Sequence, residues 1–254
     1  MLLRGVLREA AALAFLGRFG ALARSHYNVP VANHAYAAVW CPAFGADVQL
    51  ERLEQFLSTV PFAATRPGFT GLVIRAVSPA ETPLIEPDLR ASPADAAAIV
   101  EVAREFQNGD CAYEVQAHWD LWAFGAASEK FVSQPELVEI FCHGEEYDDG
   151  VWKELGHFQV DLGLEHLFTG HGRLLGFRSG QPSRAEHPDE ARFFELMTQP
   201  AKLEEYRDKT KENIRKLFDW MRRIEHAMPV KNTRLWSEGE DNFEARIEEI
   251  LAAR

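Results

Sequence analysis

Cysteine, long apolar runs and positive charge are all scarce in this chain of 254 residues. Its three cysteines (Cys41, Cys111 and Cys142) are odd in number and widely spaced, which argues against a disulfide framework and for a reducing, cytoplasmic location. No apolar run approaches the ~20 residues that a membrane-spanning helix needs, so we expect no membrane span. The net charge of −12 disfavours nucleic acid as a main partner.

The short motifs of common enzyme classes are absent as well. The sequence has no Walker A loop, no G-x-G-x-x-G loop and no C-x-x-C pair. The stretch from Gly176 to Gly180 differs from the G-x-S-x-G nucleophile elbow because its serine lies one position late. These absences favour a non-catalytic protein that needs no cofactor.

The residues that are present have ordinary globular proportions. Hydrophobic residues make up 46% and charged residues 26% of the chain, which excludes a disordered or low-complexity protein. At roughly 100–200 residues per domain, the length allows one large domain or two small ones. Either can bury a core without help from a disulfide or a metal.

The periodicity of the apolar residues predicts an α+β fold. Strands are expected where β-branched, aromatic or alternating residues run together: 34–41, 69–77, 82–85, 113–124, 136–143 and 157–162. Helices are expected where apolar residues recur at every third or fourth position: 47–60, 92–106, 189–198, 200–228 and a last helix after Gly239. The order from 34 to 124 fits a ferredoxin-like split βαβ unit, within an antiparallel or mixed sheet that a C-terminal helical region follows.

We expect the chain to consist of three parts. Residues 1–30 are predicted to form an N-terminal docking helix, because Glu9 and Arg18 bracket a short apolar stretch. The alternative is a cleaved secretory signal, since Ala21-Leu22-Ala23 resembles a signal-peptidase site. Residues 31–177 are expected to form the α+β sheet domain, and residues 188–254 the C-terminal helical region. The polar stretch at 178–187 has the composition of a linker between them.

Charge is segregated along the chain. Residues 101–170 hold 15 acidic and three basic side chains, whereas residues 200–235 hold ten basic and six acidic ones. The helix at 200–228 also carries a heptad-like apolar seam. Its partner is either the last helix of the chain or the same helix in a second copy, which would make a homo-oligomer. We expect the basic residues of 202–234, or a protein partner, to cover the acidic segment.

Five of the nine histidines fall in the acidic segment or just after it. If the strands at 113–124, 136–143 and 157–162 are antiparallel neighbours, their polar faces merge into one surface. Side chains that face each other across such strands lie about 4.5–5.5 Å apart at Cβ, close enough to share a cation. The residues that could bind a divalent metal there are His118, Asp120, His143, His157 and Asp161. The neighbouring residues with the character of a ligand or interface site are Trp122, Phe124, Glu114 and Gln116.

The segment from Gly163 to Gly172 is the most unusual local stretch, because two glycines flank His171. It is either a helix stop with a glycine cap or a loop that presents an imidazole to a ligand. In an enzyme, Glu165 would act as a general base, with His171 as the second catalytic residue. The spacing of Glu165, His166 and His171 is not the HExxH pattern of zinc proteases.

Two function classes follow from these patterns, and a third rests on fold analogy alone. The leading hypothesis is a cytosolic, non-catalytic interaction protein, an adaptor or a subunit of an assembly, with an acidic sheet face and a basic helix. The alternative is a metal-dependent enzyme, for example a hydrolase, that uses the histidines and carboxylates of the sheet. The third is a small-molecule sensor, which an apolar concavity lined by Trp122 and Phe124 would favour.

Overall fold

The structure is a computed structural model that describes residues 33–125, 128–171, 174–175 and 188–253. The predicted docking helix at 1–30 and the predicted linker at 178–187 lie outside these residues. Asn33–Arg254 form one compact unit. Its buried hydrophobic core includes side chains of the sheet and of the C-terminal helices.

Six strands form one antiparallel sheet in the order β2-β3-β4-β5-β1-β6. The strands are β1 (His34–Trp40), β2 (Gly71–Ala76), β3 (Cys111–Gly125), β4 (Lys130–His143), β5 (Phe158–Leu164) and β6 (Asn232–Ser237). The expected antiparallel neighbours β3, β4 and β5 are confirmed. Because β1 and β2 run in the same direction with three strands between them, a split βαβ character is compatible with this order.

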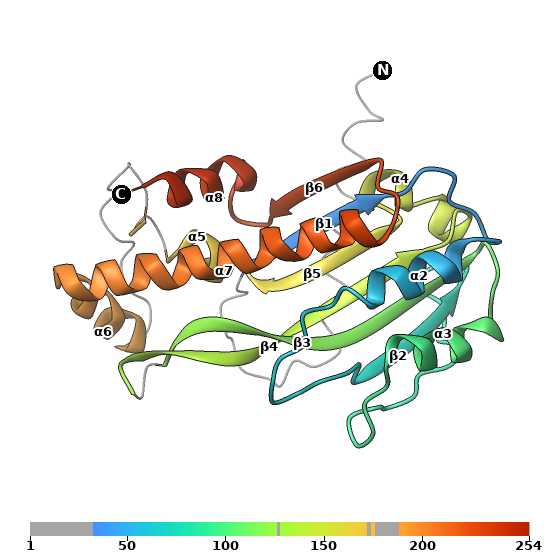
Figure 1. Ribbon diagram of the computed structural model, residues 1–254, viewed down its shortest axis with the longest axis horizontal. Coiled ribbons are helices and arrows are strands. Elements are labelled where there is room, and N and C mark those ends of the chain that lie inside the picture. Colours follow the sequence, from blue (N-terminus) through green and yellow to red (C-terminus); the bar gives the residue numbers. More distant parts are fainter. Residues whose placement is uncertain (1–32, 126–127, 172–173, 176–187, 254) are drawn as a thin grey trace. The chain divides into compact units, whose positions relative to one another are not determined.

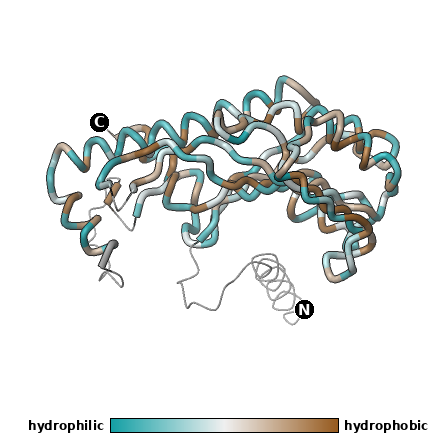
Figure 2. Tube along the Cα trace, turned by 90° about the horizontal axis from the view of Figure 1, so that it is seen from below, coloured by the Kyte–Doolittle hydropathy of each residue, from teal (hydrophilic) through white to brown (hydrophobic). Residues whose placement is uncertain are grey.

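The helices of the described residues gather mainly on one face of the sheet (Figure 1). They are α2 (Gln49–Leu57), α3 (Ala96–Arg104), α4 (Trp152–Leu155), α5 (His166–Thr169), α6 (Pro188–Met197), α7 (Pro200–Ala227) and α8 (Phe243–Ala252), with a 3-10 turn η1 (Tyr147–Asp149). Figure 2 shows hydrophobic and hydrophilic residues alternating along the helical coils, as expected for helices that bury one face. None of the helices in the described ranges is long and apolar enough to cross a membrane.

The alternation along β3 places its apolar side chains under the helices. The buried residues at every second position are Tyr113, Val115, Ala117, Trp119 and Leu121. The side chains between them, which include Glu114 and Gln116, point to the opposite face of the sheet because successive side chains of a strand alternate. The predicted polar residues Glu114 and Gln116 of β3 therefore lie on the face away from the helical layer.

Helix α7 buries the seam that its apolar spacing predicts. Its buried side chains are Tyr206, Thr210, Lys211, Asn213, Ile214, Leu217, Trp220, Met221 and Ile224. They pack against α2, α5, α6, α8 and β3, so the partner of the seam is the same chain. Burial of such a stripe, rather than helix propensity alone, is what stabilises a long amphipathic helix.

Three local expectations are wrong. Beyond residue 187 we expected only helices, but β6 lies there. Within the described part of the chain it is an edge strand that pairs with β1, and such a strand leaves a weak sequence pattern. The expected strand at 82–85 is reduced to a single bridge between Ile74 and Ile85. Helix α3 begins later than expected because Asp95, whose carboxylate accepts a hydrogen bond from the Ala98 N–H at 2.9 Å, is its N-cap.

Candidate functional site

His118 and Asp120 of β3 hold a neighbouring turn in place. The carbonyl of His118 accepts from the Ala63 N–H at 2.7 Å, and the carboxylate of Asp120 accepts from the Ala64 N–H at 3.0 Å. The Arg66 guanidinium donates to Nε2 of His118 at 3.1 Å. Burial, with Arg66 nearby, lowers the pKa of His118, so this imidazole is a neutral acceptor whose lone pair is already used.

His143 and His157 are core histidines at the end of the sheet. His143 donates from Nδ1 to the Gly156 carbonyl at 3.0 Å, and His157 accepts at Nδ1 from the Cys41 N–H at 2.9 Å. The His157 ring stacks between Phe44 and Trp152, at centroid distances of 4.2 and 4.4 Å. Burial lowers the pKa of each imidazole to about 4, so both are neutral near pH 7.

Asp161, Glu114 and Gln116 belong to the face away from the helices. Asp161 accepts from Nδ1 of His34 at 2.8 Å, an interaction that raises the pKa of His34. Gln116 donates to Glu139, which lies opposite it on β4, at 2.8 Å. Burial raises the pKa of Glu114 to about 7, and the Glu139 carboxylate adds to this rise. Protonation of Glu114 and the contact between Asp161 and His34 therefore reduce the negative charge expected on this face.

The five candidate metal ligands do not meet at one point. His118 lies opposite Leu137 and Asp120 opposite Pro135, whereas Asp161 pairs with Glu139 and with Tyr36. Each of these side chains already has a protein partner of its own. Within the ranges that the structure describes, no group of three or more histidine, cysteine or carboxylate side chains is placed to hold a metal ion.

The residues of the unusual loop also have structural partners. The Glu165 carboxylate accepts from the Gly239 N–H at 2.8 Å, and burial raises its pKa. Nδ1 of His171 lies 2.9 Å from the Tyr206 hydroxyl on α7. The two proposed catalytic residues are therefore turned to different partners. Trp122 and Phe124, in contrast, do line a cavity together.

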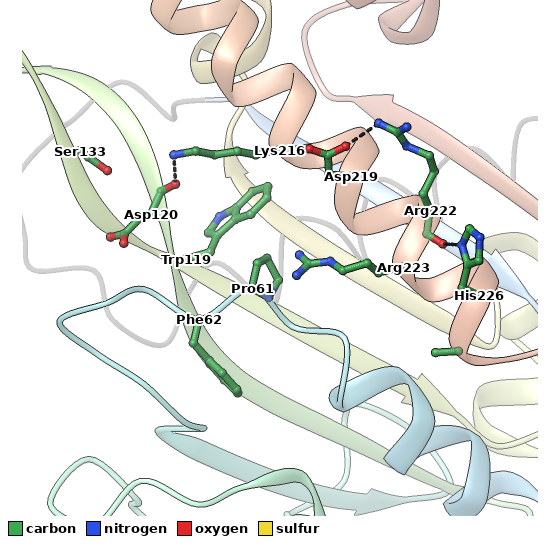
Figure 3. A pocket seen from close by; sticks show the side chains of 11 residues that line it. Pro61, Phe62, Trp119, Asp120, Ser133, Lys216, Asp219, Arg222, Arg223 and His226 are labelled. Carbon is green, nitrogen blue, oxygen red and sulfur yellow. Dashed lines mark hydrogen bonds and ion pairs between the residues drawn. The ribbon is translucent and has the colours of Figure 1, made fainter.

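A groove of about 970 Å³ lies beside α7 (Figure 3). We call it the basic groove. One wall is the C-terminal half of α7, and the other is formed by β3, β4 and the chain that follows α2. Its lining residues are Pro61, Phe62, Trp119, Asp120, Ser133, Lys216, Asp219, Arg222, Arg223, His226 and Ala227.

Contacts between segments far apart in the sequence build the basic groove. The Trp220 indole N–H donates to the Thr59 hydroxyl at 3.0 Å and so fixes the end of α2 against α7. Pro61 and Phe62 follow directly, and a bridge between Phe62 and Trp119 sets them beside β3. On α7, the polar residues at 216, 219, 223 and 226 recur at intervals of three and four, so they share one helical face.

The donors of the basic groove are only partly used. Lys216 donates from Nζ to the Asp120 carbonyl at 2.8 Å, and burial lowers its pKa. Arg222 forms an ion pair with Asp219. Arg223 has no hydrogen bond or ion pair with any described residue, and in Figure 3 its guanidinium lies beside Pro61. The buried indole N–H of Trp119 also has no partner.

This arrangement is suited to anionic groups. A guanidinium and an ammonium are strong donors to carboxylates. Phe62 and Pro61 add apolar surface next to these donors. The basic block at 200–235 is visible in the sequence, but its composition alone does not single out the residues of the groove. The intervals of Lys216, Asp219 and Arg223 would have been the signal.

The expected cover of the acidic segment by basic residues is confirmed in part. Lys216 reaches β3, and Nζ of Lys209 lies 3.7 Å from the centre of the Trp122 ring. Arg234 donates to the Glu154 carbonyl at 2.9 Å. The ion pairs of Lys202, Lys209 and Arg222 join residues within α7. The contacts of Lys216, Lys209 and Arg234 with the acidic segment are made to two carbonyls and a ring.

No protein-family model, curated protein or solved structure matches this chain. The function has to be inferred from the chemistry of the site itself.

Proposed function

We propose that this protein is a non-catalytic interaction protein whose basic groove binds an acidic segment of a partner protein. The observation that carries the proposal is the unpaired Arg223 beside Lys216 and Arg222, in an open groove that also offers the apolar surface of Phe62. A partner segment with carboxylates and an apolar residue would pair the free donors and cover that surface.

Two features support a protein partner other than a second copy or a nucleic acid. The apolar seam of α7, which would form a homodimeric coiled coil, is buried in its own chain. The whole-chain charge of −12 opposes a polyanion that extends beyond the groove, whereas a short acidic segment contacts only the local cations.

We also propose a cytoplasmic location. All three cysteines are free and buried, which supports a reducing compartment.

The alternative of a metal-dependent enzyme has less support. It requires His118, His143 and His157 to share a cation with the nearby carboxylates. Each of these imidazoles instead makes its own hydrogen bond to a different protein group. We therefore base the proposal on the groove.

Fluorescence anisotropy with an N-terminally labelled hexaglutamate peptide tests the proposal. We expect the full chain to bind this peptide and the Arg223→Glu variant to bind it at least about tenfold more weakly, because the reversal places a carboxylate in the groove. Arg215→Glu is the matched control, since Arg215 is exposed on the same helix outside the groove and the two variants have equal net charge.

Two results would contradict the proposal. Equal losses in the Arg223→Glu and Arg215→Glu variants would show that the peptide responds only to overall charge. No binding of the peptide to the wild-type chain at low ionic strength, where exposed charges act most strongly, would show that the groove does not hold acidic segments.

A further inference from the structure

A second cavity, of about 390 Å³, lies between the tip of the β3–β4 hairpin and helices α5, α6 and α7. We call it the aromatic cavity. Its volume falls within the range of roughly 300–1,000 Å³ that is usual for small-molecule sites. The rings and imidazoles that line it are Trp122, Phe124, Phe131, Phe193, Tyr206, His166 and His171.

The aromatic walls hold one another in fixed positions. Phe124 and Phe193 meet edge to face with ring centres 5.1 Å apart, and Phe131 stacks on Tyr206 at 5.5 Å. Phe193 and Tyr206 are almost fully buried although they border the cavity. Rings that are packed in this way form a preorganised surface for another flat ring, because little side-chain freedom is lost when the ligand binds.

Hydrogen bonds fix the proton positions of His171. The Tyr206 hydroxyl accepts from the main-chain N–H of His171 at 2.7 Å. Its own proton is then directed to Nδ1 of the same residue, at 2.9 Å, because no other acceptor for it is present among the described residues. A neutral imidazole that accepts at Nδ1 carries its proton on Nε2, so His171 retains one N–H donor that no described residue uses.

The charged residues of the lining are already engaged. Lys209 pairs with Glu212 at 2.9 Å and lies over the Trp122 ring. Glu136 accepts from the Gln134 amide at 2.6 Å, and Glu190 also has a partner. Burial lowers the pKa of His166 to about 3 and that of His171 to about 4, so both rings are neutral near pH 7. A charged ligand would lose hydration in the cavity without gaining an opposite charge.

We propose that the aromatic cavity binds a neutral, planar aromatic small molecule that stacks on its rings and accepts a hydrogen bond from His171. This site is separate from the basic groove and does not depend on the partner proposed for it.

Calorimetric titration of the full chain with 2-naphthol at pH 7.5 tests this proposal. We expect 2-naphthol to bind at least about tenfold more tightly than 2-naphthoate or 2-naphthylmethylammonium, because the latter two bring a charge into a site without a free counter-charge. Ala123→Leu, which fills part of the cavity from β3, should abolish binding. Ala252→Leu, an equal change at an exposed position of α8, should leave binding unchanged.

A second variant keeps the test decisive if Ala123→Leu fails to fold. His171→Phe retains a flat ring but removes the donor, so it should weaken 2-naphthol binding about fivefold or more. Arg223→Glu should have no effect, which separates this site from the basic groove. The proposal is overturned if 2-naphthol does not bind at millimolar concentration, if 2-naphthoate binds more tightly, or if folded Ala123→Leu and His171→Phe proteins both bind as the wild type does.

Discussion

The buried amide of Asn213 joins three parts of the structure through a single side chain. Its Oδ1 accepts from the Trp122 N–H at 2.8 Å, and its Nδ2 donates to the carbonyls of Trp122 and Leu167 at 2.9 and 3.0 Å. Helix α7 is thereby bonded to the free edge of β3 and to α5. The residue is 1% exposed, so water cannot replace these bonds.

We expect Asn213→Ala to lower the free energy of unfolding by about 3 kcal/mol, since each buried backbone group left without a partner costs about 1–3 kcal/mol. Urea denaturation followed by tryptophan fluorescence measures the change. Asn232→Ala is the control, because Asn232 is exposed on β6 and should alter stability by less than about 0.5 kcal/mol. Equal unfolding midpoints for Asn213→Ala and wild type would show that the amide is dispensable.

A second expectation at the residue scale is that His143 makes the free energy of unfolding depend on pH. The unfolded chain protonates His143 near the ordinary pKa of 6.5, whereas the folded chain does so only near 4. Between these values the unfolded state binds more protons, so the free energy of unfolding falls as pH falls. The contribution of this one buried residue is about 1.4 kcal/mol per pH unit.

His143→Gln should therefore flatten the dependence of the unfolding free energy on pH between 6.5 and about 5, as measured by urea titrations at several pH values. Asn232→Gln, a change at an exposed residue that does not titrate, should leave the dependence as it is. The same slope in wild type and His143→Gln would mean that His143 is protonated equally in the folded and unfolded states.

Alternation along the sequence predicted which face of a strand the histidines occupy, but not what they contact. The period-two pattern placed Gln116 and His118 on the polar face, as found. The partners of His157, in contrast, are Phe44, from a segment more than 100 positions earlier in the chain, and Trp152 on α4. A local pattern carries no information about such contacts, so the side chains of the alternative metal site are instead divided among separate hydrogen bonds.

At the scale of elements, the packing of the helical layer depends on α7, which contacts α2, α5, α6 and α8. Leu217 is fully buried in the seam, and the neighbouring Arg215 is exposed. Leu217→Asp should lower the unfolding free energy by several kcal/mol, because it buries a carboxylate without a partner. Arg215→Asp places the same residue type on the solvent side and should change stability by less than about 1 kcal/mol.

Thermal denaturation followed by circular dichroism compares the two variants. A Leu217→Asp protein that melts at the wild-type temperature would show that this face of α7 is exposed.

The elements that could be predicted are those with strong periodicity of their own. The intervals of three and four in α7 and the alternation in β3 are properties of each segment alone, and both elements are confirmed. The basic groove could not be predicted, because it depends on contacts such as that between Thr59 and Trp220, which are 161 positions apart. Strand β6 was missed for the same reason, since the strand that it pairs with among the described residues, β1, is almost 200 positions earlier in the chain.

At the scale of the whole molecule, the net charge and the local charge of the groove act in opposite directions. A chain of net charge −12 repels an acidic ligand at long range, but at physiological salt this repulsion is screened beyond about 8 Å. The cations that line the groove lie within that distance of a bound segment. We therefore expect the affinity for an acidic peptide to depend more on the position of a changed charge than on the net charge of the chain.

Asp219→Asn tests this expectation. The change removes the carboxylate that pairs with Arg222 and leaves that guanidinium free for the ligand. Binding of the labelled hexaglutamate peptide should become about threefold tighter, which is the scale of an exposed ion pair. Asp208→Asn makes the same chemical change at an exposed position of α7 outside the groove, so it gives the same net charge and should have little effect. If the two variants bind the peptide equally, the total charge governs the interaction and the groove does not.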